Sequence, residues 1–455
     1  MYRKNAWEKY SANEEKEVMK FAEGYKDFLS KSKTERLAVK ESVKLLEANG
    51  FVAIEKVKSL KAGDKVYFIN KNKNVCAFII GKKPLEEGLR ILGAHIDSPR
   101  MDFKEHPLYE KNEFALADTH YYGGIKKYQW VTIPLALHGV VCKKDGSVVE
   151  VNIGESEKDP VVGISDLLIH LAADQMGKPA SKVIEGEALD VTLGNKPLKG
   201  KEKNAVKANI LKLLKKKYDI EEEDFLSAEI EVVPAGKARD YGLDSSMIAG
   251  YGHDDRSCAY TSLMALLESS DLEYTGCCIL VDKEEIGSVG ATGAHSLFFE
   301  NAIAKLLMLS SAKNPLWTAR SVLENSKMLS SDVSAGFDPL FPGVFDPANG
   351  AYFSYGIVFN KYTGSRGKSG SNDANPEYYA WVRKVMDEAN VNWQNAELGK
   401  VDQGGGGTIA YILGNYNMNV IDAGIPVLNM HAPMEIVSKA DVYEAYKGYL
   451  AFLKA

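Results

Sequence analysis

Cysteine is scarce in this sequence. Five cysteines occur among 455 residues, at positions 76, 142, 258, 277 and 278, and no two of them have Cys-x-x-Cys spacing. An odd number without this spacing argues against a disulfide framework and against a zinc finger. The scarcity fits a reducing compartment, so we expect a cytoplasmic protein.

Long apolar runs and an excess of basic residues are also missing. No stretch approaches the roughly 20 apolar residues that a membrane span needs, and the first 30 residues lack the apolar region of a signal peptide. Lysine and arginine total 56 and aspartate and glutamate total 62, which gives a formal net charge of −6. A dedicated nucleic-acid binder normally has a basic surface and a high pI. We therefore expect neither a membrane nor a nucleic acid as a partner.

One segment is nevertheless locally basic. Residues 196–217 contain nine lysines, and an acidic run follows at 221–224. A nucleic-acid patch is one interpretation, and a solvated surface helix beside a neutralising acidic turn is the other. The second is favoured because Ile210, Leu211 and Leu214 provide a packing face and no aromatic platform for bases is present.

The first hundred residues alternate between helical and extended patterns. Apolar residues with helical spacing predict two helices within residues 1–50. Short apolar runs at 65–70, 75–80 and 89–94 then predict strands, and the last of them ends at a histidine. This alternation is typical of an α/β domain.

The pattern changes after about residue 102. Residues 128–153 are rich in β-branched side chains and contain an Asp-Gly hairpin signal. Helical and strand patterns alternate again from about residue 240. The sequence therefore predicts an α/β domain of residues 1–102 and 240–455 that is interrupted by a β-rich insert at 103–239.

Several common catalytic motifs are absent. The sequence contains no His-Glu-x-x-His, no Walker A lysine loop and no Gly-x-Ser-x-Gly elbow. Gly405-x-Gly407 loosely resembles a dinucleotide fingerprint, but the residues before it are too polar for the preceding strand that such a site requires. A flexible or ligand-lining loop is the better interpretation.

Side chains of the kind that bind metals follow several apolar runs. His95 stands where a predicted buried strand ends, and Asp97 is close enough to fix the tautomer of its imidazole. A structural His–Asp pair is an equally good interpretation of these two residues. Asp254 precedes a predicted helix, where its carboxylate would either bridge two cations or cap the helix at the surface.

The remaining candidates are carboxylates and a second histidine. Glu284 and Glu285 enter a glycine-bounded turn after an apolar strand, and extended backbone would point them in opposite directions. One would then bind a metal while the other faces the water that the metal activates. Asp332 and His431 also follow short apolar runs. Nitrogen and oxygen donors together suit zinc, cobalt or manganese, and two such ions would support hydrolysis of an amide.

Five short segments occur in an order that resembles a known family. They read HIDSP, HDDR, EEIGS, SD and NMH, and they begin at His95, His253, Glu284, Ser331 and Asn429. This order resembles the co-catalytic zinc aminopeptidases, and the chain is most similar to the aspartyl aminopeptidase family. The resemblance covers about residues 35–453. It implies a mixed-sheet zinc-aminopeptidase catalytic domain that carries a β-rich dimerisation insert.

The resemblance also implies a role for each matching residue. Asp254 would bridge two divalent ions, with His95 and Asp332 at one ion and Glu285 and His431 at the other. Glu284 would be the general base, and Asp97 would orient His95. His170 resembles a family histidine that a neighbouring subunit presents to the active site, although a core histidine is an alternative interpretation. Dimers in this family and its relatives commonly assemble into dodecamers.

Three segments differ from the usual pattern of the family, and one of them is 333–336, where the family often has a histidine directly after the residue that matches Asp332. The Asp-Asp-Arg sequence at 254–256 resembles glutamyl or deblocking aminopeptidases, and residues 356–360 lack the basic residue expected on the substrate side. The resemblance implies a two-metal aminopeptidase that acts on peptides, and a preference for acidic N-termini is the finer specificity that the aspartyl aminopeptidase family implies. The alternatives are a deblocking or glutamyl-type aminopeptidase or deacylase on this scaffold, and a noncatalytic metal-binding assembly protein.

Overall fold

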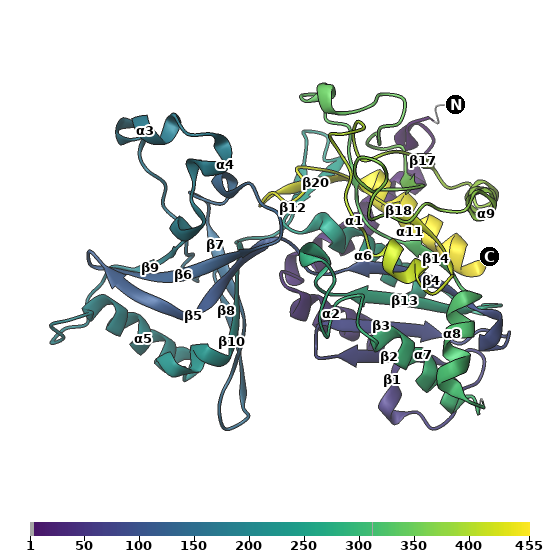
Figure 1. The fold of residues 1–455 in the computed structure, drawn as a ribbon, viewed down its shortest axis with the longest axis horizontal. Coiled ribbons are helices and arrows are strands. Elements are labelled where there is room, and N and C mark those ends of the chain that lie inside the picture. The colour runs from purple at the N-terminus through teal and green to yellow at the C-terminus, as the bar shows by residue number, and fades with distance from the viewer. Residues whose placement is uncertain (1–3, 312) are drawn as a thin grey trace. The chain divides into compact units, whose positions relative to one another are not determined.

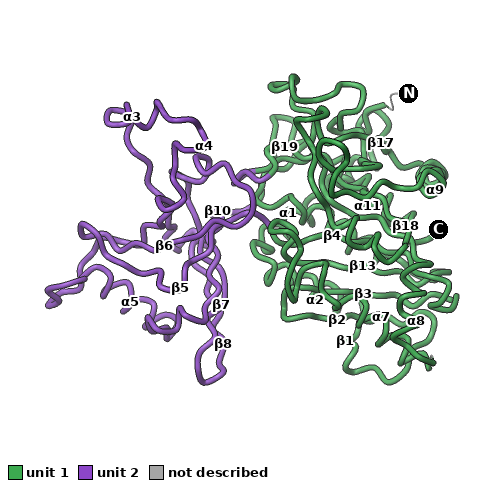
Figure 2. The backbone as a smooth tube through the Cα atoms, in the orientation of Figure 1, with its two compact units in different colours: residues 1–97, 238–430, 435–455 green, residues 98–237, 431–434 purple. Residues whose placement is uncertain are grey.

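The computed structural model describes residues 4–311 and 313–455, and the chain divides into two compact units (Figure 2). Unit 1 contains both ends of the chain, and unit 2 is formed mainly by one internal stretch. Their residues are 1–97, 238–430 and 435–455 in unit 1, and 98–237 and 431–434 in unit 2. No helix among the described residues is long and apolar enough to cross a membrane.

Unit 1 is built around a mixed nine-stranded sheet (Figure 1). In spatial order the strands are β1 (Val52–Ala53), β2 (Lys65–Asn70), β3 (Asn74–Ile79), β13 (Thr275–Val281), β4 (Leu89–His95), β14 (Lys327–Ser330), β18 (Asn419–Gly424), β16 (Ile357–Asn360) and β17 (Trp393–Asn395). Strand β4 is parallel to both of its neighbours, β13 and β14. Because β4 is central and parallel, its carboxyl end opens onto the edge where α/β proteins place their sites.

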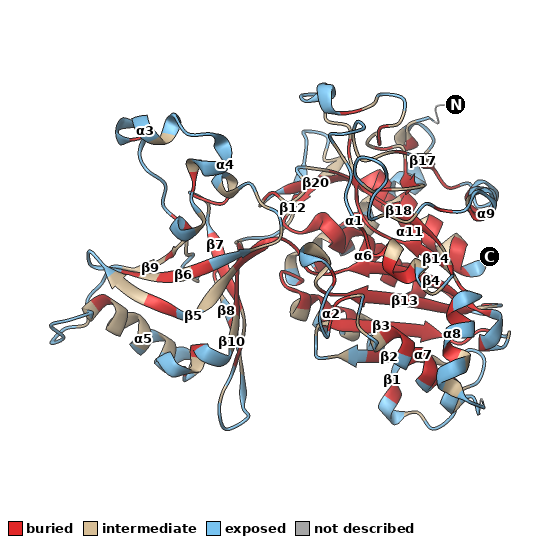
Figure 3. Cartoon of the chain, in the orientation of Figure 1, coloured by how far each residue is buried: buried red, intermediate tan, exposed pale blue. Residues whose placement is uncertain are grey.

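Helices cover both faces of this sheet. The α-helices of unit 1 are α1 (Ala12–Lys31), α2 (Glu35–Ala48), α6 (His253–Leu267), α7 (Phe298–Leu309), α8 (Pro315–Glu324), α9 (Pro376–Glu388), α10 (Ala410–Gly414) and α11 (Lys439–Lys454). Successive residues of β4 face opposite sides, so Leu92 joins the core with α1, α2, α6, α9 and α11, whereas Ile91 joins the core with α7, α8 and α10. Burial on both faces explains why β4 is apolar almost throughout (Figure 3).

Shorter elements complete unit 1. A second sheet has the order β11 (Arg239–Tyr241), β12 (Met247–Gly250), β20 (Glu435–Ser438), β19 (Pro426–Leu428) and β15 (Ser334–Ala335). The 3-10 helices are η1 (Ala6–Glu8), η2 (Ile54–Lys56), η3 (Leu85–Glu87), η8 (Glu284–Ile286) and η9 (Pro342–Val344). The strands expected at 65–70, 75–80 and 89–94 occur as β2, β3 and β4, each within one residue of the expected ends. The expected mixed α/β fold is therefore confirmed.

Unit 2 contains an antiparallel six-stranded sheet. Its order is β8 (Val148–Ile153), β7 (Leu135–Cys142), β10 (Ala228–Pro234), β5 (Arg100–Lys111), β6 (Phe114–Tyr122) and β9 (Val191–Gly194). Its helices are η4 (Lys127–Gln129), η5 (Ile169–Leu171), α3 (Ala173–Met176), α4 (Ala180–Val183), η6 (Gly186–Ala188), α5 (Ala205–Tyr218) and η7 (Glu222–Ser227). The expected Asp-Gly hairpin connects β7 and β8, which pair antiparallel.

The lysine-rich segment forms helix α5. Lys207 pairs with Glu222 at 2.5 Å, and Lys215 pairs with Asp219 and Glu221 at 2.5 and 2.8 Å. Val206 at the start of the helix is buried. These acidic partners match the interpretation of the segment as a solvated helix beside a neutralising turn.

We expect Leu92→Ala to lower the free energy of unfolding of unit 1 by about 2–5 kcal/mol, because the leucine is fully buried and leaves a cavity. Leu316→Ala is the matched control, since this leucine is 59% exposed and its loss should change stability by less than about 0.5 kcal/mol. Urea unfolding measures both variants. Equal stability of the two variants would contradict the two-sided burial of β4.

Candidate metal centre

His95 ends strand β4 and is buried at the carboxyl edge of the sheet. Its Nε2 lies 3.1 Å from Oδ1 of Asp254. Its Nδ1 lies 3.1 Å from the carbonyl oxygen of Asp97 and 3.3 Å from Oδ1 of the same residue. Burial would lower the pKa of His95, but hydrogen bonds to Asp254 and Asp97 outweigh it and raise the pKa well above the ordinary value. Oxygens at Nδ1 favour a proton there, which leaves Nε2 as a ligand atom.

Asp254 lies at the start of α6 and is also buried. Asp254 and Asp255 both depart from helical backbone angles, so their side chains do not follow the helix. The N–H of Asp254 donates to Oε2 of Glu435 at 3.0 Å. The N-cap residue of α6 is Gly252, and no side chain forms a capping hydrogen bond at this end of the helix. The alternative interpretation of Asp254 as a surface helix cap therefore does not fit.

Asp332 approaches the same point from the neighbouring strand. It follows β14, and its Oδ1 lies 3.9 Å from Nε2 of His95. Ligand atoms of His95, Asp254 and Asp332 all lie within 4.8 Å of one another. Burial, and then the charge of Asp255, raise the pKa of Asp332 well above its ordinary value. The three expected side chains thus converge on one point.

Glu284 and Glu285 lie in the 3-10 helix η8, so the expectation of extended backbone at this turn is wrong. Lys283 before them and Gly287 after them have left-handed backbone angles, which turn the chain tightly. Oε2 of Glu284 lies 4.0 Å from Nε2 of His95. Ligand atoms of His95, Glu284 and Glu285 also lie within 4.8 Å of one another. A 3-10 turn rather than alternation along a strand brings both glutamates to the site.

Asp97 has a second set of contacts that the sequence did not suggest. Its Oδ1 accepts the backbone N–H of Glu284 at 3.2 Å, and its Oδ2 accepts that of Glu285 at 3.1 Å. Asp255 is a further residue that sequence reasoning missed. Its Oδ2 accepts the backbone N–H of His95 at 3.3 Å, and burial raises its pKa well above the ordinary value. Only its position next to Asp254 could have signalled this role.

The two remaining candidate histidines belong to unit 2. His431 follows β19 by three residues and lies in the short segment 431–434, where its Nδ1 donates to the carbonyl oxygen of Gly124 at 2.7 Å. Its grouping with Asp254 and Glu285 stays a prediction. His170 lies in η5 and is exposed, so the alternative interpretation as a core histidine is wrong. Its role toward a neighbouring subunit stays a prediction.

The donor set fits a divalent cation. Asp254 and Asp332 are buried carboxylates whose ligand atoms lie within 4.8 Å of each other and of His95, and Oε2 of Glu284 lies 4.0 Å from Nε2 of His95. Buried like charges are costly without a compensating positive charge. Imidazole nitrogen and carboxylate oxygen without cysteine are ligands that suit zinc. The positive charge of a metal ion would compensate these carboxylates, and this attraction would favour metal binding.

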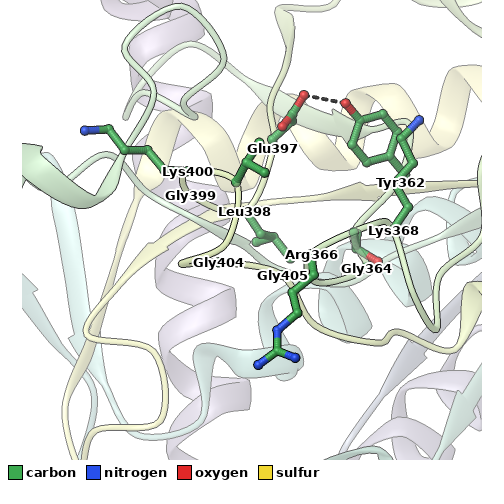
Figure 4. A pocket seen from close by; sticks show the side chains of 12 residues that line it. Tyr362, Gly364, Arg366, Lys368, Glu397, Leu398, Gly399, Lys400, Gly404 and Gly405 are labelled. Carbon is green, nitrogen blue, oxygen red and sulfur yellow. Dashed lines mark hydrogen bonds between the residues drawn. The ribbon is translucent and has the colours of Figure 1, made fainter.

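A separate pocket of about 110 Å³ lies between the loops 362–368 and 397–405 (Figure 4). Gly404 and Gly405 line it, and a ligand-lining role of this loop stays a prediction. A Cβ atom on Gly405 would lie 2.5 Å from Cα of Ser365, so glycine lets the two loops approach. The charged side chains that line the pocket are Arg366, Lys368, Glu397 and Lys400.

Comparisons with known proteins extend over almost the whole chain. The family described as aminopeptidase I zinc metalloprotease (M18) matches residues 28–453. A probable M18 family aminopeptidase 1 of Clostridium acetobutylicum is 59% identical, in a match that covers 99% of this chain and 98% of that protein. A relative of the same description from Thermotoga maritima is 47% identical and covers 100% of this chain and 99% of its own length.

Solved structures agree with the sequence comparisons. The crystal structure of an M18 aminopeptidase from Thermotoga maritima has a TM-score of 0.96 and 46% identity, and the match covers 100% of this chain and 99% of that one. The structure of aminopeptidase I from Clostridium acetobutylicum has a TM-score of 0.92 and 57% identity, with 99% of each chain covered. The fold and the cluster of histidine and carboxylate side chains agree with these matches: the chain belongs to the M18, or aspartyl aminopeptidase, family of zinc aminopeptidases.

Proposed function

We propose that this protein uses two divalent metal ions to remove the N-terminal residue from peptides. The observation that carries the proposal is the convergence of His95, Asp254 and Asp332 beside Glu284. In this proposal His95 and Asp332 bind the first ion, Glu285 and His431 bind the second, and Asp254 bridges them. Zinc is the expected metal, with cobalt and manganese as alternatives. The free cysteines support a reducing, cytoplasmic location.

Bound metal would polarise the scissile carbonyl and lower the pKa of a water molecule. The protein side chains then divide the remaining work. Glu284 stands at the rim of the ligand cluster, where its carboxylate can accept a proton from the attacking water and return it to the leaving amine. Asp97 orients the imidazole of His95 and, through the two backbone N–H groups, holds the turn that carries Glu284. One carboxylate thus aligns a metal ligand with the base.

The finer specificity that we propose is for acidic N-terminal residues. The pocket between loops 362–368 and 397–405 has three cationic side chains and one carboxylate, and Glu397 already accepts a hydrogen bond from Tyr362 (Figure 4). An anionic side chain would find a net positive surface there.

The glycine-rich loop that lines the pocket leads into a residue that is bonded to the central sheet. Thr408, at the end of the glycine-rich loop, donates to Oδ1 of Asp422 at 2.7 Å. Asp422 in turn is the register partner of Ser330 at the end of β14. The loop that lines the pocket is thereby tied to the strand that precedes Asp332.

Self-association through unit 2 is the second part of the proposal. Apolar side chains there are exposed around His170, namely Leu167, Leu168, Ile169, Leu171 and Met176. Contiguous exposed apolar residues are typical of an interaction surface. The mApe1 aminopeptidase of yeast, which shares the fold at 21% identity and a TM-score of 0.76 over 95% of this chain and 96% of its own, is described as a dodecamer. We expect a dimer that assembles further, with His170 presented to a neighbouring site.

We expect Glu284→Gln to lower kcat for aminoacyl substrates at least about 100-fold, because the amide cannot accept the proton. Zinc content per chain, measured by atomic absorption, should stay unchanged. Glu324→Gln is the control, since this exposed glutamate lies on α8. Full activity of Glu284→Gln with zinc still bound would refute the role of this residue as base.

For substrate preference, we expect Arg366→Ala to lower kcat/KM at least about tenfold on glutamyl and aspartyl substrates and to leave leucyl substrates unaffected. The loss should appear in KM, because the cation binds the side chain rather than the reacting bond. Lys16→Ala, an exposed cation of α1, is the control.

Activity of the wild-type protein on N-blocked peptides alone would favour the deacylase alternative. Zinc binding by the wild-type protein without turnover of any peptide would favour a noncatalytic assembly protein.

For assembly, we expect the double variant Leu168→Asp and Leu171→Asp to lower the molecular mass in solution, because charged side chains oppose burial of the surface. Light scattering coupled to size-exclusion chromatography measures the mass. Leu213→Asp, on the exposed face of α5, is the control. An unchanged mass of the double variant would exclude this surface as the interface.

A further inference from the structure

Arg256 is a buried cation that binds neither metal nor substrate in the proposed mechanism. It lies in the first turns of α6 and is 1% exposed. Its Nε donates to the carbonyl oxygen of Ile96 at 3.2 Å, and its NH2 group donates to that of Lys33 at 3.2 Å. The ring of Tyr251 lies 5.4 Å from the centre of the guanidinium. The cation therefore contacts backbone carbonyls of two separate segments.

The position of Ile96 gives this contact its significance. Ile96 stands between His95, which is a proposed ligand, and Asp97, which binds the Glu284 turn. Its N–H donates to the carbonyl oxygen of Val281 at 2.9 Å, so both backbone polar groups of Ile96 are hydrogen-bonded. Arg256 completes this pair of bonds and fixes the direction in which the chain leaves β4.

Three consecutive residues of α6 contact the same two neighbouring residues, His95 and Ile96. The Asp254 carboxylate meets the imidazole of His95, the Asp255 carboxylate accepts the N–H of His95, and Arg256 donates to the next carbonyl along. The distance between His95 and Asp254 is thus set in part by the hydrogen bonds of Asp255 and Arg256 to the backbone of His95 and Ile96. A change in any of these contacts would move His95 relative to Asp254.

Stability alone does not explain an arginine here. A buried guanidinium loses its hydration, and neutral carbonyls compensate it only in part. An apolar side chain of similar size is often as stable or more stable at such a position. Lysine would keep the charge, but it lacks the planar fork that reaches two carbonyls in fixed directions.

We propose that Arg256 is a positioning residue that sets the spacing of His95 and Asp254 and thereby the zinc affinity of the centre. This inference rests on the proposed metal function. Its expected magnitude follows from other metal sites, where loss of a residue that orients a ligand weakens metal binding by about 10–100-fold.

The test compares Arg256→Met and Arg256→Lys with wild-type protein and with a control that also removes a buried cation. Lys439→Met is that control, because Lys439 is fully buried and pairs with Asp240 at 2.9 Å. Zinc dissociation constants are measured by competition with a chromophoric chelator, and thermal midpoints are measured on the metal-free proteins. We expect both Arg256 variants to bind zinc at least about tenfold more weakly. Lys439→Met should lose thermal stability and keep its zinc affinity.

Three outcomes would overturn the inference. They are wild-type zinc affinity in Arg256→Met, equal losses of affinity in Arg256→Met and Lys439→Met, and failure of both Arg256 variants to fold while Lys439→Met folds. The last outcome would make Arg256 a residue of the core. Failure of the proposed metal function would give a different result. Wild-type protein would then bind no zinc, or would bind zinc no more tightly than the variant His95→Ala, which lacks a proposed ligand.

Discussion

The site depends on the contacts that the carboxylate of Asp97 makes with His95 and with the turn of Glu284 and Glu285. This carboxylate lies beside the Nδ1 of His95 and accepts the backbone N–H groups of Glu284 and Glu285. A carboxylate held by backbone N–H groups cannot turn without breaking two bonds, so the imidazole is held as firmly as the turn. These contacts join the segment after β4 to the segment after β13, which lies 187 and 188 residues further along the chain.

Burial explains why this point attracts a cation. Helix α6 is buried on every side along most of its length, as expected for a helix packed between the sheet and other helices. Its first residues are nevertheless charged, and water is not available to solvate them. The imidazole of His95 partly compensates the charge of Asp254, the backbone N–H of His95 partly compensates that of Asp255, and a bound metal ion would supply the remaining positive charge. Electrostatic cost and metal affinity therefore have the same origin.

The sequence predicted the parts of this arrangement that depend on local patterns. The apolar run of β4 identified a buried strand, and its end located His95 at the edge where sites form. The positions of Asp254 and Asp332 beside predicted elements made them candidates, the family resemblance implied their roles, and the structure brings both to His95. The sequence did not reveal that Glu284 and Glu285 lie in a 3-10 turn, because the left-handed angle at Lys283 falls on a residue type that gives no signal for it.

The contacts of Asp255 and Arg256 show why the rest could not be predicted. Each of these side chains bonds to backbone atoms of residues 160 positions away. Every residue has the same backbone N–H and carbonyl groups apart from proline, so the residue types at positions 95 and 96 could not predict the hydrogen bonds of Asp255 and Arg256. A ligand is recognisable by its chemistry, whereas the group that positions it is recognisable only by what it touches. The geometry of such a centre therefore depends on buried polar residues beside its ligands as well as on the ligands, and a search for metal-binding residue types alone does not find them.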